Sequence, residues 1–358
     1  MTRYKAAVIG CGMIGGSCDS PEDEKIISHA HAYHSHEQFE ISCCCDIDRR
    51  ALLNFKQKWG KHIRSYTDID KLLRNEDFDV VSIASSTETH AEILSRVLKK
   101  ESVRLIVCEK PFVSKLGKLD EIKKYIRIHP EKILLINFPR RYDPGFQKLT
   151  DTVTKDDLGK PIAFNAAFTK GLYHNGCHML ELIERLFGDI KKITAHENVV
   201  VNDDLYGSYF IETERNAGNI TNFVPFGYSM FEMDILFENG RIRIADSGHH
   251  LEIHRPKESE LYKGYNFLHH DFTIEDSLKK CMLHTIEAGR QLFENNYLKT
   301  NEIFESHLAL SEKLLILKNS LRSGAVTVSF DRIGRVKDDE HTGDSWRTES
   351  PQETVSSV

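Results

Sequence analysis

The stretch VIGCGMIGGS, residues 8–17, places Gly10, Gly12 and Gly15 directly after an apolar run. The run, residues 6–9, is short and partly β-branched, which favours a strand buried on both faces of a parallel sheet. In a strand–turn–helix unit, the first glycine allows the tight turn, the second lets a pyrophosphate approach the backbone, and the third lets helix and strand pack closely. The pattern therefore predicts a dinucleotide site at a helix start, although glycine turns without a ligand can share this spacing.

The next predicted strand supplies a second part of such a site. Residues 40–45 form an apolar run that ends at Asp46, where a dinucleotide site places the carboxylate that binds the adenosine ribose. The gap between the glycines and this acid is usually about twenty residues. Residues 17–38 make it longer here. We expect Asp46 to favour NAD, because a carboxylate repels the 2′-phosphate of NADP, but NADP remains possible.

Length and composition limit the other functions. With 358 residues, the chain is long enough for two domains. No apolar stretch approaches the ~20 residues of a membrane helix, and the first strand begins too early to leave room for an export signal, so we expect a cytoplasmic protein without a membrane partner. A formal net charge of −6 gives no basic footprint for nucleic acid.

Two groups of residues could suggest a metal. The eight cysteines show no zinc spacing, and three of them are consecutive in residues 43–45, which favours reduced, buried thiols. The run SHAHAYHSHE, residues 28–37, contains four histidines, but no carboxylate or cysteine set completes a site. We interpret this run as an exposed polar helix and predict no metal site.

The remaining pattern predicts two domains. In residues 1–138, strands at 40–45, 78–86, 103–111 and 132–138 alternate with helical stretches, which indicates a doubly wound parallel sheet, the Rossmann domain. Residues 139–331 are rich in longer β runs, with a hairpin signal at Asn239-Gly240 and a helix near 176–188, and so predict an α+β domain with a large, mostly antiparallel open sheet. Residues 332–358 are polar and aperiodic, which predicts a disordered tail.

Two residues could carry acid–base chemistry. Lys110, in CEKPF, follows an apolar strand and so lies at the carboxyl edge, where ligands bind in doubly wound sheets. A lysine there could donate to a substrate oxygen, although a surface lysine in a loop is the ordinary alternative. His178 begins an amphipathic helix and could move a hydroxyl proton near neutral pH, or it could be a core or capping histidine.

Taken together, these motifs resemble the Gfo/Idh/MocA oxidoreductases. The resemblance covers about residues 6–330 and rests on motifs in the family's order: GCGMIGG, CCDID, SIASSTETHAEI, CEKPF, NFPRRYDP and GCHMLELIERLFGD. It implies a Rossmann domain with a bound nicotinamide dinucleotide, followed by an open sheet whose outer face forms a homo-oligomer, a dimer or tetramer. The segment after the glycines resembles the family's SHA.AY segment, which supports the polar-helix interpretation of the histidine run.

The resemblance also implies site residues. For the cofactor these are Gly10, Gly12, Met13, Ile14, Asp46, Ser85, Thr87, His90, Glu109 and Lys110. For the substrate they are Arg141, Tyr142, Lys170, Tyr173, His174, Asn175 and His178. Lys110 and His178 match the family's catalytic pair.

The sequence departs from the family at one site position. Four residues before His178, where many members carry an aspartate, this chain has His174. We expect an oxidoreductase that transfers a hydride between a nicotinamide and a secondary alcohol or ketone of a sugar, sugar nucleotide or cyclitol. A histidine in place of the acid would favour a negatively charged substrate, such as a uronate or a nucleotide diphosphate, unless it merely packs under its loop. The same departure leaves open a regulatory protein that binds the dinucleotide without turnover.

Overall fold

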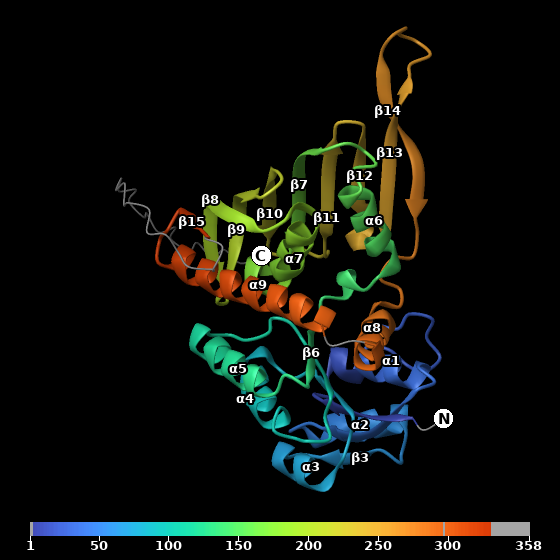
Figure 1. Ribbon diagram of the computed structural model, residues 1–358, viewed down its shortest axis with the longest axis vertical. Coiled ribbons are helices and arrows are strands. Elements are labelled where there is room, and N and C mark those ends of the chain that lie inside the picture. Colours follow the sequence, from blue (N-terminus) through green and yellow to red (C-terminus); the bar gives the residue numbers. More distant parts are fainter. Residues whose placement is uncertain (1–2, 296–297, 331–358) are drawn as a thin grey trace, which may run out of the picture.

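A six-stranded parallel sheet forms the first half of the computed structural model, which describes residues 3–295 and 298–330 (Figure 1). Its strand order is β3-β2-β1-β4-β5-β6. The strands are β1 (Tyr4–Ile9), β2 (Phe39–Cys45), β3 (Arg64–Tyr66), β4 (Val80–Ile83), β5 (Leu105–Cys108) and β6 (Ile133–Ile136). The helices between them are α1 (His29–Ser35), α2 (Arg49–Trp59), α3 (Ile69–Asn75), α4 (Thr87–Val97) and α5 (Leu116–Ile128). The predicted tail, residues 332–358, lies outside the described residues.

Both faces of this sheet are covered, which explains its continuous apolar strands. In β1, Ala6 and Val8 point into one core, shared with α1 and α2, while Ala7 and Ile9 point into the other, shared with α3, α4 and α5. All parallel strands end at one edge, so the turns after β1, β2, β4, β5 and β6 lie side by side. This edge carries the candidate site.

A nine-stranded sheet forms the second half, in the order β14-β13-β12-β11-β7-β10-β9-β8-β15. It is antiparallel apart from one parallel pair, β7 with β10, which confirms the predicted mostly antiparallel sheet. Its strands are β7 (Pro161–Thr169), β8 (Ile190–Val201), β9 (Asp204–Thr213), β10 (Ala217–Phe223), β11 (Phe231–Phe237), β12 (Gly240–Ala245), β13 (His250–Glu258), β14 (Asn266–Ile274) and β15 (Thr327–Ser329). The hairpin predicted at Asn239-Gly240 joins β11 and β12.

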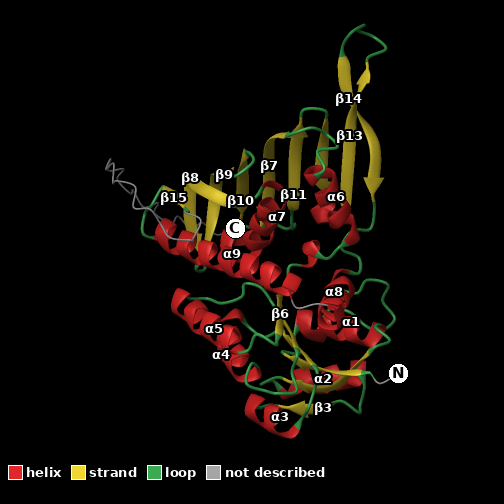
Figure 2. Cartoon of the chain, in the orientation of Figure 1, coloured by secondary structure: helices red, strands yellow, loops and turns green. Residues whose placement is uncertain are grey.

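Helices fill the space between the two sheets. The helices α6 (Pro144–Thr154), α7 (Gly176–Phe187) and α9 (Leu298–Arg322) lie on one face of the larger sheet, and Figure 2 shows α9 running between the two sheets. The helix α8 (Cys281–Asn295) returns to the first sheet, where Met282 and Ile286 pack with α1. The predicted fold class, a Rossmann domain followed by an α+β domain, is confirmed. The exact division at residue 138 stays a prediction.

The glycine turn differs from the expected helix start. After Gly12 the chain forms only a short helical turn, η1 (Met13–Ser17), and α1 begins at His29. The intervening loop is closed on itself, because the Asp19 carboxylate accepts the amides of Ile27 and Ser28, each at 2.9 Å. The end of α2 also holds it, since Lys58 Nζ donates to the carbonyl of Asp19 at 2.7 Å.

The histidine run is not an exposed polar helix, and that prediction was wrong for its first two members. His29 and His31 are 0% and 1% exposed, because α1 is packed between the first sheet and α8. Each buried ring has a carboxylate partner: Glu109 lies 2.9 Å from His29 Nε2, and Asp19 lies 3.1 Å from His31 Nδ1. His34 is exposed, and His36 contacts Glu287.

Within residues 3–295 and 298–330, no helix is long and apolar enough to cross a membrane.

The glycine turn allows a direct test of the fold. A Cβ on Gly15 would lie 1.9 Å from the carbonyl oxygen of Gly10, whereas a Cβ on Gly12 would meet nothing within 4 Å. We expect Gly15→Ala to lower the free energy of unfolding by about 3 kcal/mol or more, because backbone must move to admit the methyl group. The free energy of unfolding of Gly12→Ala should differ from that of the wild type by less than about 1 kcal/mol. Thermal and denaturant unfolding of both variants measure this, and equal stabilities would contradict the close packing.

Candidate functional site

The glycine turn forms an open cradle at the carboxyl edge of the first sheet. Gly10, with φ of +93°, could not carry a side chain, because a Cβ would lie 2.5 Å from the backbone of Ala84. Gly12 faces open space instead. The first amides of a helical turn have no partner within that turn, so the amides that follow Gly12 can bind an anion. The cradle therefore has the shape and the donors that a pyrophosphate needs.

Asp46 lies directly beside this turn. Its Oδ2 accepts the amide of Cys11 at 2.7 Å, and its Oδ1 accepts the amide of Asp48 at 2.8 Å. These two bonds fix the carboxylate at the end of β2, while each oxygen keeps a second lone pair for another donor. Asp46 thus lies beside the glycine turn despite the longer chain segment of residues 17–38, and its contact with a ribose hydroxyl stays a prediction.

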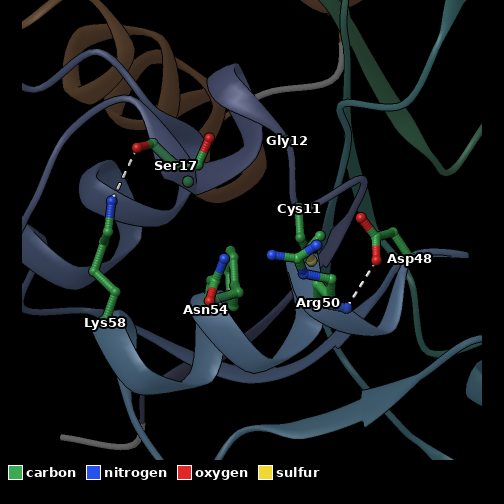
Figure 3. A pocket seen from close by; sticks show the side chains of 10 residues that line it. Cys11, Gly12, Ser17, Asp48, Arg50, Asn54 and Lys58 are labelled. Carbon is green, nitrogen blue, oxygen red and sulfur yellow. Dashed lines mark hydrogen bonds between the residues drawn. The ribbon is translucent and has the colours of Figure 1, made fainter.

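A pocket of about 530 Å³ extends from the turn toward α2 (Figure 3). Its polar lining comes from Ser17, Asp48, Arg50, Asn54 and Lys58, which Figure 3 shows around the cavity beside Cys11 and Gly12. Lys58 is held by two backbone carbonyls, those of Ser17 and Asp19. Arg50 forms no ion pair among the residues that the structure describes, so a positive group stays available beside the cradle.

The loop after β4 is tied to the loop after β5 through His90. The His90 ring, 1% exposed, has Nε2 3.0 Å from the carbonyl oxygen of Ser85 and Nδ1 3.1 Å from that of Pro111. Thr89 Oγ1 donates to Ser85 Oγ at 2.8 Å. His90 therefore holds the turn that carries Lys110. Direct cofactor contacts by Ser85, Thr87 and His90 stay predictions.

Glu109 is buried at the end of β5 in a polar network. Its Oε1 accepts from Asn137 Nδ2 at 2.6 Å and lies 2.9 Å from His29 Nε2. On the other side of the imidazole, Ser82 Oγ lies 2.8 Å from His29 Nδ1 and 2.9 Å from the Tyr33 hydroxyl.

The network defines its own proton positions. In the described chain, the buried Tyr33 hydroxyl has Ser82 Oγ as its acceptor, so the serine proton points to His29 Nδ1. The His29 proton is then on Nε2 and is donated to Glu109. These hydrogen bonds, together with the field of Lys110, hold the pKa of Glu109 below its usual range, although burial opposes them. A carboxylate is thus kept ionised next to Lys110.

The second half of the chain brings His178 to this edge. His178 lies in the first turn of α7, is 7% exposed, and its ring meets the Phe138 ring edge-on at 5.6 Å. Lys110 Nζ donates to the carbonyl of His174 at 3.2 Å, which joins the two halves at the site. Burial lowers the pKa of His178 well below its ordinary value, and the positive charges of Lys110, Arg140 and His174 add to this. The imidazole is therefore neutral at pH 7 and able to accept a proton.

The loop before α7 holds three predicted substrate residues. Asp204, at the start of β9, accepts the amides of Tyr173 and His174 at 2.8 and 2.9 Å. The Tyr173 hydroxyl donates to the carbonyl of Val113, and Asn175 Nδ2 donates to the carbonyl of Thr169 at 2.8 Å. Tyr173 and Asn175 thus shape the loop in this state, and their substrate contacts stay predictions.

Among the residues that the structure describes, the side chains of His174 and Lys170 form no hydrogen bond or ion pair. The His174 ring is exposed, and its pKa is lowered by partial burial and by the charges of Lys110 and Lys170, against which Asp204 acts. The position where relatives were expected to carry an aspartate therefore lies near Lys110 and Lys170 as well as Asp204.

Two further predicted substrate residues, Arg141 and Tyr142, follow β6. Arg141 Nε donates to Glu181 Oε1 at 2.7 Å, so its charge is already balanced. The Tyr142 hydroxyl is buried without a hydrogen-bond partner among the described residues. Their roles stay predictions.

Sequence reasoning missed Arg140, Asp204 and the His29–Glu109 pair. Arg140 carries no ion pair in the described chain and lies beside the α7 end that bears His178. The doubled arginine in NFPRRYDP is a visible signal, but the sequence alone does not tell which arginine is paired. The described part of the chain contains no group of three or more His, Cys, Asp or Glu side chains that could hold a metal ion.

Comparison with known proteins agrees with this geometry. Residues 4–137 match the Gfo/Idh/MocA model, described as an oxidoreductase family with an NAD-binding Rossmann fold. The inositol 2-dehydrogenase of Salmonella typhimurium is 25% identical over 158 residues, 44% of each chain. The myo-inositol 2-dehydrogenase of Thermotoga maritima is 30% identical over 157 residues, 44% of this chain and 42% of the relative. The chain thus spans less than half the length of these curated relatives.

Solved structures extend the likeness to both halves. An oxidoreductase from Agrobacterium radiobacter, solved with NAD+, L-tartaric acid and magnesium, superposes with a TM-score of 0.69 at 18% identity, covering 92% of this chain and 98% of that one. Apo scyllo-inositol dehydrogenase from Lactobacillus casei gives 0.69 at 14% identity with the same coverage. At these identities, the likeness shows the two-domain fold alone.

The charges around His178 generate a prediction. A histidine whose pKa is depressed by folding stays neutral in the native state while the unfolded state takes up a proton, so this group lowers stability as the pH falls below about 6.5. We expect the pKa of His178 to lie below the ordinary range of histidine. Lys110→Met should raise this pKa, because a nearby cation is removed. NMR titration of the ring carbons measures both. An unchanged midpoint in Lys110→Met, equal to that of a Lys118→Met control, would contradict the coupling.

Proposed function

We propose that this chain, which belongs to the Gfo/Idh/MocA oxidoreductases through its residues 4–137, is a nicotinamide-dependent oxidoreductase. Its reaction would interconvert a secondary alcohol and a ketone on a sugar, sugar nucleotide or cyclitol. The observation that carries the proposal is the meeting of Lys110 with the His174–His178 segment, at the edge that also carries the Gly12 cradle. Names of the relatives, inositol and apiose dehydrogenases, support the same class of substrate.

The cofactor would lie along the carboxyl edge of the first sheet. Amides following Gly12, at Met13 and Ile14, would hold the pyrophosphate, and Asp46 would accept a ribose hydroxyl. The fixed carboxylate of Asp46 favours NAD over NADP. Arg50, which lines the adjoining pocket, is the positive group that would allow NADP to bind. When bound, the nicotinamide supplies the hydride acceptor or donor.

The protein's own residues would handle the proton. Lys110 as an ammonium would donate to the substrate oxygen and lower the pKa of the hydroxyl. Neutral His178 would take the hydroxyl proton during oxidation and return it during reduction. Glu109, held by His29 and Asn137, would keep a carboxylate next to Lys110 in the chain.

The presence of His174 instead of an aspartate has consequences for the charge of the substrate and for a second candidate function. With Lys110 and Lys170 nearby, a neutral His174 leaves this position without the negative charge by which an aspartate would repel an anion, which supports a negatively charged substrate. The same replacement favours a second candidate, a protein that binds the dinucleotide and regulates a partner without turnover. The intact pair of Lys110 and His178 favours the enzyme.

We propose a homo-oligomer that assembles through the outer face of the nine-stranded sheet. Helices cover the other face, and Figure 2 shows the β13–β14 hairpin extending beyond the rest of the sheet. Exposed apolar side chains on this sheet and hairpin are Ile162, Val199, Val200, Leu236, Leu261, Tyr262, Tyr265, Phe267 and Leu268. Such a patch is typical of a surface that a second copy covers.

The cofactor assignment predicts a preference that depends on Asp46. Calorimetric titration should give tighter binding of NAD+ than of NADP+, and Asp46→Asn should reduce this preference about tenfold, since one charge and one acceptor are lost. Asparagine keeps an oxygen for the amide of Cys11, and Asp70→Asn on α3 serves as the control. Tighter NADP+ binding by the wild type, or an unchanged ratio in Asp46→Asn, would contradict the role of Asp46.

The catalytic assignment predicts a split between turnover and binding. On a panel of sugars, cyclitols and sugar nucleotides, Lys110→Met should lower kcat about 10²- to 10⁴-fold while NAD+ affinity changes less than about threefold. NADH absorbance and calorimetry measure the two quantities. A fully active Lys110→Met variant would refute the lysine role, and a wild type that binds NAD+ but turns over no substrate in the panel would favour the regulatory candidate.

A further inference from the structure

We propose that Arg140 binds an acidic group of the substrate, a carboxylate or a phosphate, so that the chain acts on an anionic sugar derivative. This inference rests on the proposed function, because it names a substrate contact of the same site. Arg140 belongs to η2 (Pro139–Arg141), the turn that follows β6. Since β6 pairs with β5, this turn lies next to the one that carries Lys110.

The helix α7 places Arg140 beside His178. The side chains His178, Glu181 and Arg185 occupy positions i, i+3 and i+7, so they share one face of the helix. Arg185 Nη1 donates to the carbonyl of Arg140 at 3.0 Å, and Glu181 accepts from Arg141 at 2.7 Å. At the other end of the turn, Phe138 contacts the His178 ring. The face of α7 that carries the proposed base therefore packs directly on the turn that carries Arg140.

Aromatic packing and a single hydrogen bond hold the Arg140 guanidinium. Its Cζ lies 3.6 Å from the centroid of the Phe231 ring and 5.8 Å from that of Phe146. Its Nη2 donates to the carbonyl of Ser247 at 3.3 Å. Stacking on an aromatic face orients the planar group without using its donors, so the guanidinium is held ready for a further partner.

The charge of Arg140 is not balanced within the described part of the chain. Its neighbour Arg141 pairs with Glu181, but Arg140 has no carboxylate within ion-pair distance, and its Nε is buried without any partner. An enclosed charge without a counter-ion is unfavourable unless a ligand supplies one. Burial lowers the pKa of Arg140 to about 10, which still leaves the group charged at pH 7.

Lys110 supplies a second positive charge near His178. The charge of Lys110 acts on His178, whose pKa it lowers together with burial and the charge of Arg140. Nearby carboxylates are already engaged: Glu181 by Arg141, Glu109 by His29 and Asn137, and Asp204 by the amides of the 171–175 loop. A substrate anion would complete the site, in bidentate contact with the guanidinium.

The test uses matched acidic and neutral sugars bound to the full chain in saturating NAD+. Calorimetry would compare D-glucuronate and D-glucose 6-phosphate with D-glucose, D-galacturonate with D-galactose, and UDP-glucuronate with UDP-glucose. We expect at least one acid to bind about tenfold or more tightly than its neutral match, and Arg140→Met to weaken that acid about 10- to 100-fold while the neutral match changes less than about threefold. The glucuronate and glucose 6-phosphate arms distinguish a carboxylate from a phosphate.

Controls separate this inference from the proposed function. Arg74→Met, which removes an exposed arginine on α3, should keep the acid preference. If Arg140→Met does not fold, Arg140→Gln, which retains an amide donor for Ser247, takes its place. Failure of wild-type NAD+ binding would overturn the proposed function. Normal NAD+ binding without any acid preference, or a preference that survives in Arg140→Met, would overturn the role of Arg140 alone.

Discussion

The ionised carboxylate of Glu109, buried at the end of β5, is the constraint on which the site depends. An unpaired buried carboxylate is very unfavourable, so the surrounding elements must deliver donors to it. His29 comes from α1, Asn137 from the turn after β6, and Thr285 Oγ1 of α8 donates to the side-chain Oδ1 of Asn137 at 3.2 Å. Satisfying one carboxylate therefore fixes how α1 and α8 sit against the sheet, and it does so directly beside Lys110.

The unequal distribution of charge follows from this arrangement. The carboxylates of Glu109 and Glu181 have hydrogen-bond or ion-pair partners inside the protein, whereas the Arg140 guanidinium pairs with no carboxylate in the described part of the chain. Burial and the charges of Lys110 and Arg140 hold the pKa of His178 well below its ordinary value, so the imidazole remains neutral. The replacement of an expected aspartate by His174 thus fits a wider pattern at this site and does not stand as an isolated change.

Much of the fold was predictable, because the spacing of apolar residues along strands and helices indicates directly which side chains are buried. Both sheets, the hairpin at Asn239-Gly240 and the edge that carries Gly12, Asp46 and Lys110 follow from short-range patterns. The burial of His29 and His31 did not follow, since it depends on Glu109 and Asp19, whose approach the chain order does not reveal.

The sequence also could not predict which of two neighbouring arginines forms an ion pair with a carboxylate. Arg140 and Arg141 are chemically identical, and only the register of α7, which presents Glu181 to one of them, decides which charge is balanced. Likewise, the sequence did not reveal that Tyr173 and Asn175 bond to the carbonyls of Val113 and Thr169, and their expected substrate contacts stay predictions.

A crystal structure of the chain with NAD+ tests the central claim most directly. We expect the pyrophosphate on the amides after Gly12, a ribose hydroxyl on Asp46, and the nicotinamide ring beside Lys110 and His178. A dinucleotide bound elsewhere, or a nicotinamide ring far from both Lys110 and His178, would contradict it.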